Sequence, residues 1–285
     1  MIPFDWLEPE TLQEAVALLD PEDTSVRPIA GGTALMLMMK AGVFTPTRLV
    51  SLAKIEKRYS EIRLDHEGVL HVGAMATLSD LEQSPHVKEH FKVIRRALRT
   101  LSNVRVRNVA RVGGALAHGD PHMDLPPLFA ALGARVVAIG PNGTREIPVE
   151  DLYAGYYETT LAKNELIAEA IVPPLNGAAA AYSKATSRSA DDWPAVNVGV
   201  RVEMEDGRFR QLRIVVSAAT EKVTRLHRTE EFLTGRKDND RERVHQSLAI
   251  ATSEVSFLSD AHGSVPYKKE LLRAHLGRAL IEARP

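Results

Sequence analysis

Two pairs of adjacent glycines, Gly31-Gly32 and Gly113-Gly114, constrain this chain most, because each follows a short apolar run. Glycine has no Cβ, so such a pair lets the backbone adopt positive φ and brings its N–H groups close to a bulky anion, most often a phosphate. Neither pair fits the three spaced glycines of a dinucleotide-binding fingerprint or the Gly-Lys-Ser/Thr ending of a P-loop. One such pair alone is more often a tight turn or a bulge. Two pairs, each between a strand and a helix, predict a two-loop cradle for a diphosphate.

The second glycine pair leads into a loop that suits a ligand. Asp124 stands directly before Leu-Pro-Pro at 125–127, which predicts an N-cap followed by prolines in the first turn of a helix. The loop also holds four residues of metal-binding types: His118, Asp120, His122 and Asp124. Pro121 and the neighbouring glycines argue against a helix with both imidazoles on one face, so a metal site is not expected.

Length, charge and cysteine content narrow the class of protein. A chain of 285 residues predicts two domains, or one large domain with an appendage. The formal net charge of -1 provides no general attraction to nucleic acid or to a membrane surface. The chain has no cysteine, so any iron–sulfur cluster or thiolate chemistry must belong to a partner. No run approaches the roughly 18 apolar residues of a membrane span and no signal-peptide pattern is visible, so a cytoplasmic protein is expected.

Alternating strand and helix patterns predict a mixed α+β organisation. Before residue 58 we expect strands over 4–7, 27–30 and 48–51 and helices over 11–19 and 34–41, the first opening with a Thr11–Glu14 capping box. From 58 to 172 we expect strands over 62–64, 69–72, 135–139, 144–148 and 166–172 and a helix over 85–101. After a linker at 173–177 we expect strands over 178–185, 195–204 and 209–217, then helices over 224–233, 241–253 and 267–283.

The stretch at 92–111 carries seven cations and no acidic residue. A nucleic-acid-binding arm would interleave aromatic residues with its cations, and only Phe91 lies close by. The apolar positions favour an amphipathic helix instead: Val93, Ile94, Ala97, Leu98 and Leu101. The basic face is therefore expected to be solvated or to contact a partner, and no nucleic-acid partner is expected.

Further motifs complete an ordered set along nearly the whole chain. They are Ala-Gly-Gly-Thr-Ala at 30–34, Arg-Asn at 107–108, Arg-Val-Gly-Gly-Ala at 111–115, Asp-Pro at 120–121, Asp-Leu-Pro-Pro at 124–127, Leu-Gly-Ala at 132–134, Thr-Leu at 160–161 and Glu-Leu-Ile at 165–167. A Pro-Phe start at 3–4 with Leu-x-Glu-Ala at 12–15, and Pro173, extend the set. In this order the motifs resemble the FAD-binding medium subunit of the molybdenum hydroxylases, the carbon-monoxide dehydrogenase and xanthine dehydrogenase group.

The resemblance implies an α+β fold in which a two-subdomain FAD-binding domain of the vanillyl-alcohol-oxidase type precedes a small C-terminal α+β domain. That last domain would contain a three-stranded sheet plus helices. We expect the first FAD-binding subdomain at 1–57, the second at 58–176 and the C-terminal domain at 177–285.

The resemblance also implies where FAD would bind. Two loops would hold the diphosphate through backbone N–H groups: Ala30, Gly31, Gly32, Thr33 and Ala34 in the first, and Arg111, Val112, Gly113, Gly114 and Ala115 in the second. Asp124 would approach the ribityl hydroxyls and Ile167 the isoalloxazine ring. Lys184 and Trp193 fall where the family places a cation and an aromatic side chain over the flavin.

Three loop positions depart from the family pattern. Ala34 replaces the usual Ser or Asp, Arg111 the usual Thr or Ser, and Ala115 the usual Asn or Ser. Three side-chain hydrogen bonds to the cofactor would be lost, although backbone donors survive any substitution. Arg111 would compensate as a cation near phosphate. We therefore expect weaker or partner-dependent flavin binding.

The implied function is electron transfer within a complex. A large molybdopterin-binding subunit would oxidise the substrate, and electrons would pass through two-iron, two-sulfur clusters of a small subunit and this chain's FAD to NAD, a quinone or dioxygen. The assembly would be a dimer of heterotrimers. Neither a nucleophile elbow nor a zinc-protease motif is present, so no catalytic residue is expected in this chain. A flavin-free structural subunit and a stand-alone flavoenzyme of the same fold remain alternatives.

Overall fold

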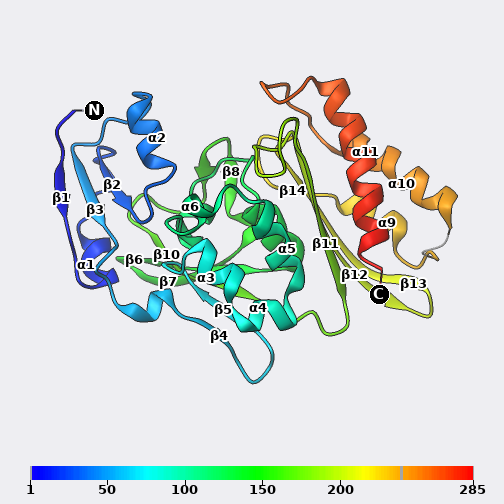
Figure 1. The fold of residues 1–285 in the computed structure, drawn as a ribbon, viewed down its shortest axis with the longest axis horizontal. Coiled ribbons are helices and arrows are strands. Elements are labelled where there is room, and N and C mark those ends of the chain that lie inside the picture. Colours follow the sequence, from blue (N-terminus) through cyan, green and yellow to red (C-terminus); the bar gives the residue numbers. More distant parts are fainter. Residues whose placement is uncertain (1, 238–239, 285) are drawn as a thin grey trace.

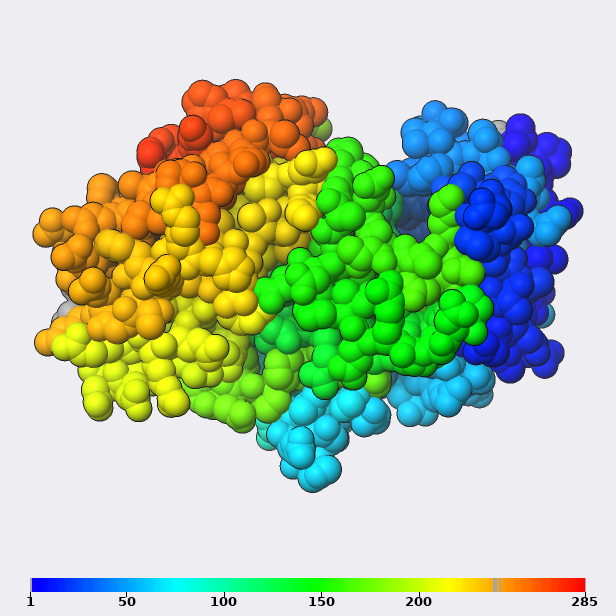
Figure 2. Space-filling model, turned by 180° about the vertical axis from the view of Figure 1, so that it is seen from behind, coloured from blue at the N-terminus to red at the C-terminus, as the bar shows by residue number. Residues whose placement is uncertain are grey.

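The computed structural model describes residues 2–237 and 240–284 and arranges them around three main sheets. Figure 1 shows the sheets following one another along the molecule, with the N-terminal strands at one end and the C-terminal helices at the other. In Figure 2, seen from behind, the blue, the cyan-to-green and the yellow-to-red parts of the chain pack side by side. Within the described ranges, no helix is both long and apolar enough to cross a membrane.

The first sheet is parallel and has the strand order β1-β3-β2. Its strands are β1 (Asp5–Leu7), β2 (Val26–Ile29) and β3 (Arg48–Ser51), joined by helices α1 (Leu12–Ala17) and α2 (Leu35–Lys40). The Thr11 hydroxyl accepts a hydrogen bond from the Glu14 N–H at 3.1 Å, as an N-cap does. The Glu14 carboxylate accepts from the Glu10 N–H instead of the Thr11 N–H, so only half of the expected capping box forms. The βαβ-like module is confirmed.

The second sheet is antiparallel, in the order β4-β5-β10-β6-β7. Its strands are β4 (Ile62–Leu64), β5 (Leu70–Gly73), β6 (Arg135–Gly140), β7 (Gly143–Pro148) and β10 (Leu166–Val172). The helices between β5 and β6 are α3 (Leu78–Gln83), α4 (Pro85–His90), α5 (Lys92–Thr100), α6 (Val104–Arg107), α7 (Val112–Ala117) and α8 (Leu125–Leu132). Two short helical turns, η1 (Lys57–Ser60) and η2 (Val149–Asp151), and a hairpin of β8 (Tyr153–Gly155) and β9 (Glu158–Thr159) complete this part. All five expected strands are found.

The helices of this part differ from expectation. The helix expected over 85–101 is divided at Phe91, where φ is -128° and ψ is 51°. Phe91 is 1% exposed, so the break turns its ring into the core. Helices α3, α6 and α7 were not expected at all. Helices this short are unstable alone, so tertiary packing rather than local pattern decides where they form.

The third sheet is antiparallel and has four strands, one more than expected, in the order β11-β12-β13-β14. Its strands are β11 (Ala179–Ala185), β12 (Val196–Glu205), β13 (Arg208–Ser217) and β14 (Thr224–Arg225), followed by helices α9 (His227–Leu233), α10 (Arg241–Glu254) and α11 (Val265–Glu282). Figure 1 shows these helices on the side of the sheet that faces away from the second sheet. The extra strand β14 occupies residues where the sequence pattern predicts the start of a helix.

Helix α8 joins the second and third sheets, and every one of its residues is buried. A helix that is apolar all round requires cover on all sides. On β12 that cover includes Gly199, where a Cβ would lie 2.8 Å from the Pro127 carbonyl oxygen and 2.9 Å from the Ala131 Cβ. The lack of a side chain at Gly199 therefore allows the strand to approach the helix. The predicted boundaries at 57/58 and 176/177 remain a proposal, which the separation of the sheets supports.

The basic stretch at 92–111 includes α5 and α6. Helix α5 buries the four residues that its pattern predicts: Val93, Ile94, Ala97 and Leu98. Two of the cations form ion pairs within the chain, Arg96 with Glu282 of α11 at 2.6 Å and Arg107 with Glu82 at 3.0 Å. Part of the basic face therefore stabilises the fold itself.

Candidate functional site

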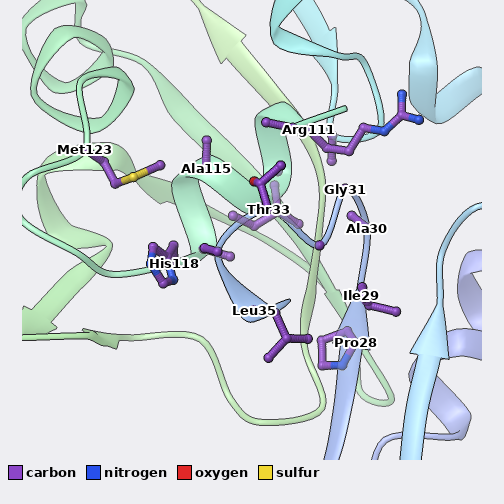
Figure 3. A pocket seen from close by; sticks show the side chains of 18 of the residues that line it. Pro28, Ile29, Ala30, Gly31, Thr33, Leu35, Arg111, Ala115, His118 and Met123 are labelled. Atoms are coloured by element: carbon purple, nitrogen blue, oxygen red, sulfur yellow. The ribbon is translucent and has the colours of Figure 1, made fainter. Parts of the chain in front are cut away.

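A cavity of about 570 Å³ lies at the junction of the three parts of the chain, and all three contribute to its lining. All but one of the expected site residues line it: Ala30, Gly31, Gly32, Thr33, Ala34, Arg111, Gly113, Gly114, Ala115, Asp124, Ile167, Lys184 and Trp193. The exception is Val112, the first residue of α7, whose side chain is fully buried. We call residues 30–34 the first bend and residues 111–115 the second bend. Figure 3 shows Gly31 and Thr33 of the first bend next to Arg111 and Ala115 of the second.

At Gly31 the first bend packs against the backbone that leads into the second bend. A Cβ on Gly31 would lie 2.2 Å from the carbonyl oxygen of Val109, a distance that no side chain tolerates. The following residue, Gly32, has a φ of 69°, in the left-handed region that favours glycine. The first bend thus needs both glycines. Gly31 allows the close contact with Val109, and Gly32 allows the left-handed backbone conformation.

The first bend presents unpaired backbone donors to the cavity. Among the described residues, none accepts a hydrogen bond from the N–H groups of Gly31, Gly32, Thr33 or Ala34. These groups lie between the end of β2 and the first turn of α2, where a helix leaves its leading N–H groups without partners. Such a row of N–H groups suits an anion.

The second bend is not the loop that the sequence pattern predicts. Gly113 and Gly114 lie in the first turn of α7, and neither has positive φ. The Val112 N–H donates to Ala76 O at 3.0 Å and the Gly113 N–H to Ala74 O at 2.8 Å, so both donors are already used. Gly113 is required because a Cβ there would lie 2.6 Å from the Ala74 Cβ. Packing, not backbone freedom, explains this glycine.

Gly114 is open toward a ligand. Its N–H has no acceptor among the described residues, whereas the Ala115 N–H donates to Arg111 O at 2.9 Å. A Cβ on Gly114 would have no atom within 4 Å, so the space beside it is free. The donor set for an anion therefore consists of the first bend and the Gly114 N–H.

Arg111 is tethered beside the cavity. One terminal nitrogen of its guanidinium donates to Met75 O at 2.9 Å. Its Nε is buried and has no partner among the described residues. In Figure 3 the guanidinium extends away from Ala115. The side chain thus brings a cation to the cavity wall and is held there by its bond to Met75 O.

Asp124 does not cap α8, contrary to expectation. Its backbone is already helical and its side chain makes no capping hydrogen bond. The carboxylate accepts from the Tyr182 hydroxyl at 2.8 Å and pairs with the Lys184 ammonium at 3.1 Å. Burial raises the pKa of Asp124, and the attraction of Lys184 opposes this shift. Lys184 also donates to Thr100 O at 2.9 Å, so this buried pair ties β11 to the start of α8.

Ile167 and Trp193 line the cavity from opposite parts of the chain. Ile167 lies on β10 where the register with β6 shifts, and such bulges often direct a side chain into a site. Trp193 lies between β11 and β12 and is 44% exposed. A half-exposed indole on a cavity wall offers a flat apolar face to a ring.

His122 is a cavity-lining residue whose partners the sequence did not reveal. Its Nδ1 lies 2.9 Å from an Asp120 carboxylate oxygen and its Nε2 lies 3.0 Å from Asp260. Burial lowers the pKa of His122, but its hydrogen bonds and charge attraction to the two carboxylates outweigh this and raise it overall. Both ring nitrogens are thus engaged, and the described residues contain no cluster that could hold a metal ion. No local pattern signals a partner 138 residues away.

Together these features fit an elongated anionic nucleotide. The first bend packs against the segment that leads into the second, five backbone N–H groups of the two bends lack acceptors among the described residues, and Arg111 lines the cavity. The remaining wall provides an aromatic face and a buried aliphatic one. The fold and site therefore define a protein of the nucleotide-cofactor-binding class.

The chain belongs to the FAD-binding medium subunits of the molybdenum hydroxylases. Residues 2–175 match the family model for the FAD binding domain in molybdopterin dehydrogenase. Residues 180–283 match the CO dehydrogenase flavoprotein C-terminal domain. The family resemblance and the fold class expected from the motifs are both confirmed.

Individual relatives agree with this membership. The carbon monoxide dehydrogenase medium chain of Hydrogenophaga pseudoflava is 31% identical over 99% of this chain and 98% of its own length. The nicotine 6-hydroxylase medium subunit of Paenarthrobacter nicotinovorans is 30% identical over 98% of this chain and 96% of its own. Among solved structures, a chain of CO dehydrogenase from Oligotropha carboxidovorans superimposes with a TM-score of 0.93 at 29% identity, covering 99% of both chains.

Proposed function

We propose that this chain is the FAD-carrying, electron-transferring subunit of a molybdenum hydroxylase. The observation that supports this most directly is that two glycine bends, both with N–H groups lacking acceptors among the described residues, line one cavity. When bound, FAD would supply one-electron exchange with iron–sulfur clusters of a partner and two-electron exchange with NAD, a quinone or dioxygen. The other tasks, which are binding, orientation and shielding from water, fall to the residues of this chain.

The backbone of the first bend and the Gly114 N–H would bind the diphosphate. Because these donors belong to the backbone, they remain available although Ala34 and Ala115 lack polar side chains. The Arg111 guanidinium, which lines the cavity, would add a positive charge near the diphosphate. The Val112 and Gly113 N–H groups are not part of this donor set, because they already donate to the backbone carbonyl oxygens of Ala76 and Ala74.

The rest of the cavity would orient the cofactor's ring system and sugar chain. Asp124 and Lys184, each less than 10% exposed in its side chain, hold one wall rigid through their ion pair. Ile167 would pack against the ring, and the Trp193 indole would cover it from the third sheet. A ring enclosed by two such apolar faces is shielded from water, which strengthens the electrostatic effect of nearby charges.

The relatives indicate which partner subunits this chain would bind. The medium chains named above belong to carbon monoxide dehydrogenase and nicotine 6-hydroxylase, and a solved CO dehydrogenase contains the matching chain. We infer a large molybdopterin-binding subunit and a small subunit with two-iron, two-sulfur clusters, since this chain has no cysteine to hold a cluster. A dimer of heterotrimers in the cytoplasm is part of the same proposal, which mass measurement and cell fractionation test.

The decisive experiment is to purify the chain alone and with its partners, and to record the visible spectrum and the released nucleotide. FAD in either preparation supports the proposal, and no flavin in both refutes it. Assembly with partners but without flavin would favour the flavin-free structural subunit. Turnover of a small substrate by the flavin-loaded chain alone would favour the stand-alone flavoenzyme.

A further inference from the structure

His122 links the cavity wall to the C-terminal domain. It lies in the loop between α7 and α8, and its Nδ1 lies 2.9 Å from an Asp120 carboxylate oxygen of the same loop. Its Nε2 lies 3.0 Å from Asp260, which stands between α10 and α11. The imidazole is 7% exposed in its side chain. One ring therefore bridges two parts of the chain at the edge of the cofactor cavity.

The carboxylates of Asp120 and Asp260 each accept a further hydrogen bond from another side chain. Asp260 accepts from the Lys268 ammonium at 2.6 Å, and the same ammonium donates to Ala218 O at 2.9 Å. Lys268 is fully buried on α11. Asp120 accepts from the Tyr157 hydroxyl at 2.8 Å. The imidazole thus sits between two acceptors that are fixed independently, one in each domain.

Charge balance in this cluster depends on His122. Two carboxylates face one lysine, so a neutral imidazole leaves one negative charge in a largely buried cluster, whereas an imidazolium neutralises it. A hydrogen bond to each carboxylate also requires a proton on both ring nitrogens. Geometry and charge agree that the bridge is complete only with His122 protonated.

The His122 ring also contacts a residue of the cofactor cavity. The Trp193 and His122 ring centroids are 6.3 Å apart at an interplanar angle of 80°, an edge-on arrangement. Trp193 is 44% exposed and belongs to the segment between β11 and β12. His122 therefore supports the one aromatic ring that the C-terminal domain contributes to the cavity wall.

We propose that His122 is a positioning residue which, as an imidazolium held by Asp120 and Asp260, fixes the C-terminal domain and Trp193 against the cofactor cavity. Its relevance to flavin rests on the proposed function, but the clamp itself is a property of the chain without cofactor. Loss of the proton removes one hydrogen bond and leaves an unbalanced charge, so the clamp weakens with rising pH.

The other titratable groups around this ring do not substitute for it. His262 lies tilted against His122 with centroids 5.0 Å apart, and only its backbone N–H contacts Asp260. His118 packs edge-on against Tyr157, and burial lowers its pKa. Tyr156, next to Tyr157, has its pKa raised, mainly by partial burial. In contrast to His118, His122 has its pKa raised overall, because two carboxylates outweigh the effect of its burial.

Tryptophan fluorescence tests the clamp without any flavin. The chain has two tryptophans, so Trp6→Phe leaves Trp193 as the only emitter. Because a nearby imidazolium quenches indole emission more strongly than a neutral imidazole, Trp193 emission of the nucleotide-free chain should rise in one step whose midpoint lies above pH 6.5, the ordinary pKa of histidine. Asp260→Asn should move the midpoint to lower pH, since a carboxylate within hydrogen-bonding distance stabilises the charged imidazole. His122→Gln should remove the step.

His262→Gln is the matched control, because it removes a neighbouring imidazole and leaves both carboxylates in place; the step should persist. A missing step, a step that survives His122→Gln, or a midpoint unmoved by Asp260→Asn would overturn the proposal. If His122→Gln fails to fold, the Asp260→Asn midpoint decides.

A second readout connects the clamp to the cofactor. In the flavin-loaded chain, the rate of flavin release should rise over the same pH interval, and His122→Gln should make it high and independent of pH. Unchanged release kinetics in His122→Gln would refute the clamp while leaving the flavoprotein assignment intact. Absence of flavin at every pH would refute the flavoprotein assignment while leaving the Trp193 result standing.

Discussion

A Cβ on Gly31 would lie 2.2 Å from the carbonyl oxygen of Val109, so the first glycine bend rests directly on the backbone that leads into the second. Backbone cannot move aside as a flexible side chain can. The contact therefore fixes the first bend relative to the segment that leads to Gly114. This makes Gly31 a structural requirement of the site.

Gly31→Ala should destabilise the chain by about 1–3 kcal/mol or more, because the methyl group overlaps a backbone carbonyl and forces the bends apart. Urea unfolding followed by circular dichroism measures this loss. Gly114→Ala is the matched control, since its methyl group enters open space. Equal stability of the two variants would contradict the close approach.

Gly114→Asp should abolish flavin retention while the chain stays folded. The new carboxylate would occupy open space beside the free Gly114 N–H, where the diphosphate is proposed to bind, and like charges repel. The measurement is the ratio of flavin absorbance to protein after gel filtration. Gly114→Ala controls for the added atoms and should retain more flavin. Unchanged flavin content in Gly114→Asp would show that the diphosphate lies elsewhere.

Asp124→Asn should cost about 3–5 kcal/mol, because it leaves the buried Lys184 ammonium without its carboxylate. Adding Lys184→Met should recover much of this loss, since the pair is then neutral and Asn can still accept from the Tyr182 hydroxyl. A double-mutant cycle in urea measures the coupling. Additive effects of the two substitutions would show that the ion pair contributes little.

Stability should depend on pH at both ends through the His122 clamp. The pKa of Asp260 is lowered to about 2: burial opposes this shift, and hydrogen bonds from Lys268 and His122 outweigh it. Its contribution is present above about pH 4 and is lost as pH falls toward 2. The raised pKa of His122 has the opposite sign, so its contribution is complete below about pH 6.5 and is lost as pH rises through the folded-state value.

Thermal unfolding of the full chain across this range measures both effects. Asp260→Asn should flatten the acid limb and reduce the alkaline one, because the substitution removes the group that titrates in acid and one of the two carboxylates that raise the His122 pKa. A profile unchanged in this variant would assign the pH dependence to other groups.

Local patterns predicted most of the strands because short apolar or alternating runs between turn residues are typical of strands. The β6–β7 hairpin follows from Gly-Pro-Asn-Gly at 140–143, and the start of α1 follows from Thr11. Prediction failed for short helices such as α6, whose four residues cannot be stable without neighbours. It failed also at Phe91, where burial of one ring interrupts a continuous helical pattern.

By itself, the sequence determined which family the chain belongs to, where its two glycine pairs lie and most of the residues that line the cavity, because turns and ordered motifs depend on residues close together in the chain. Only the tertiary structure decided how these residues are used. In the folded chain the Val112 and Gly113 N–H groups donate to the carbonyl oxygens of Ala76 and Ala74, and the Gly114 N–H stays available to a ligand. It also paired Asp124 with Lys184 and His122 with Asp260. Such pairings are set by packing between distant segments, and the local sequence carries no record of them.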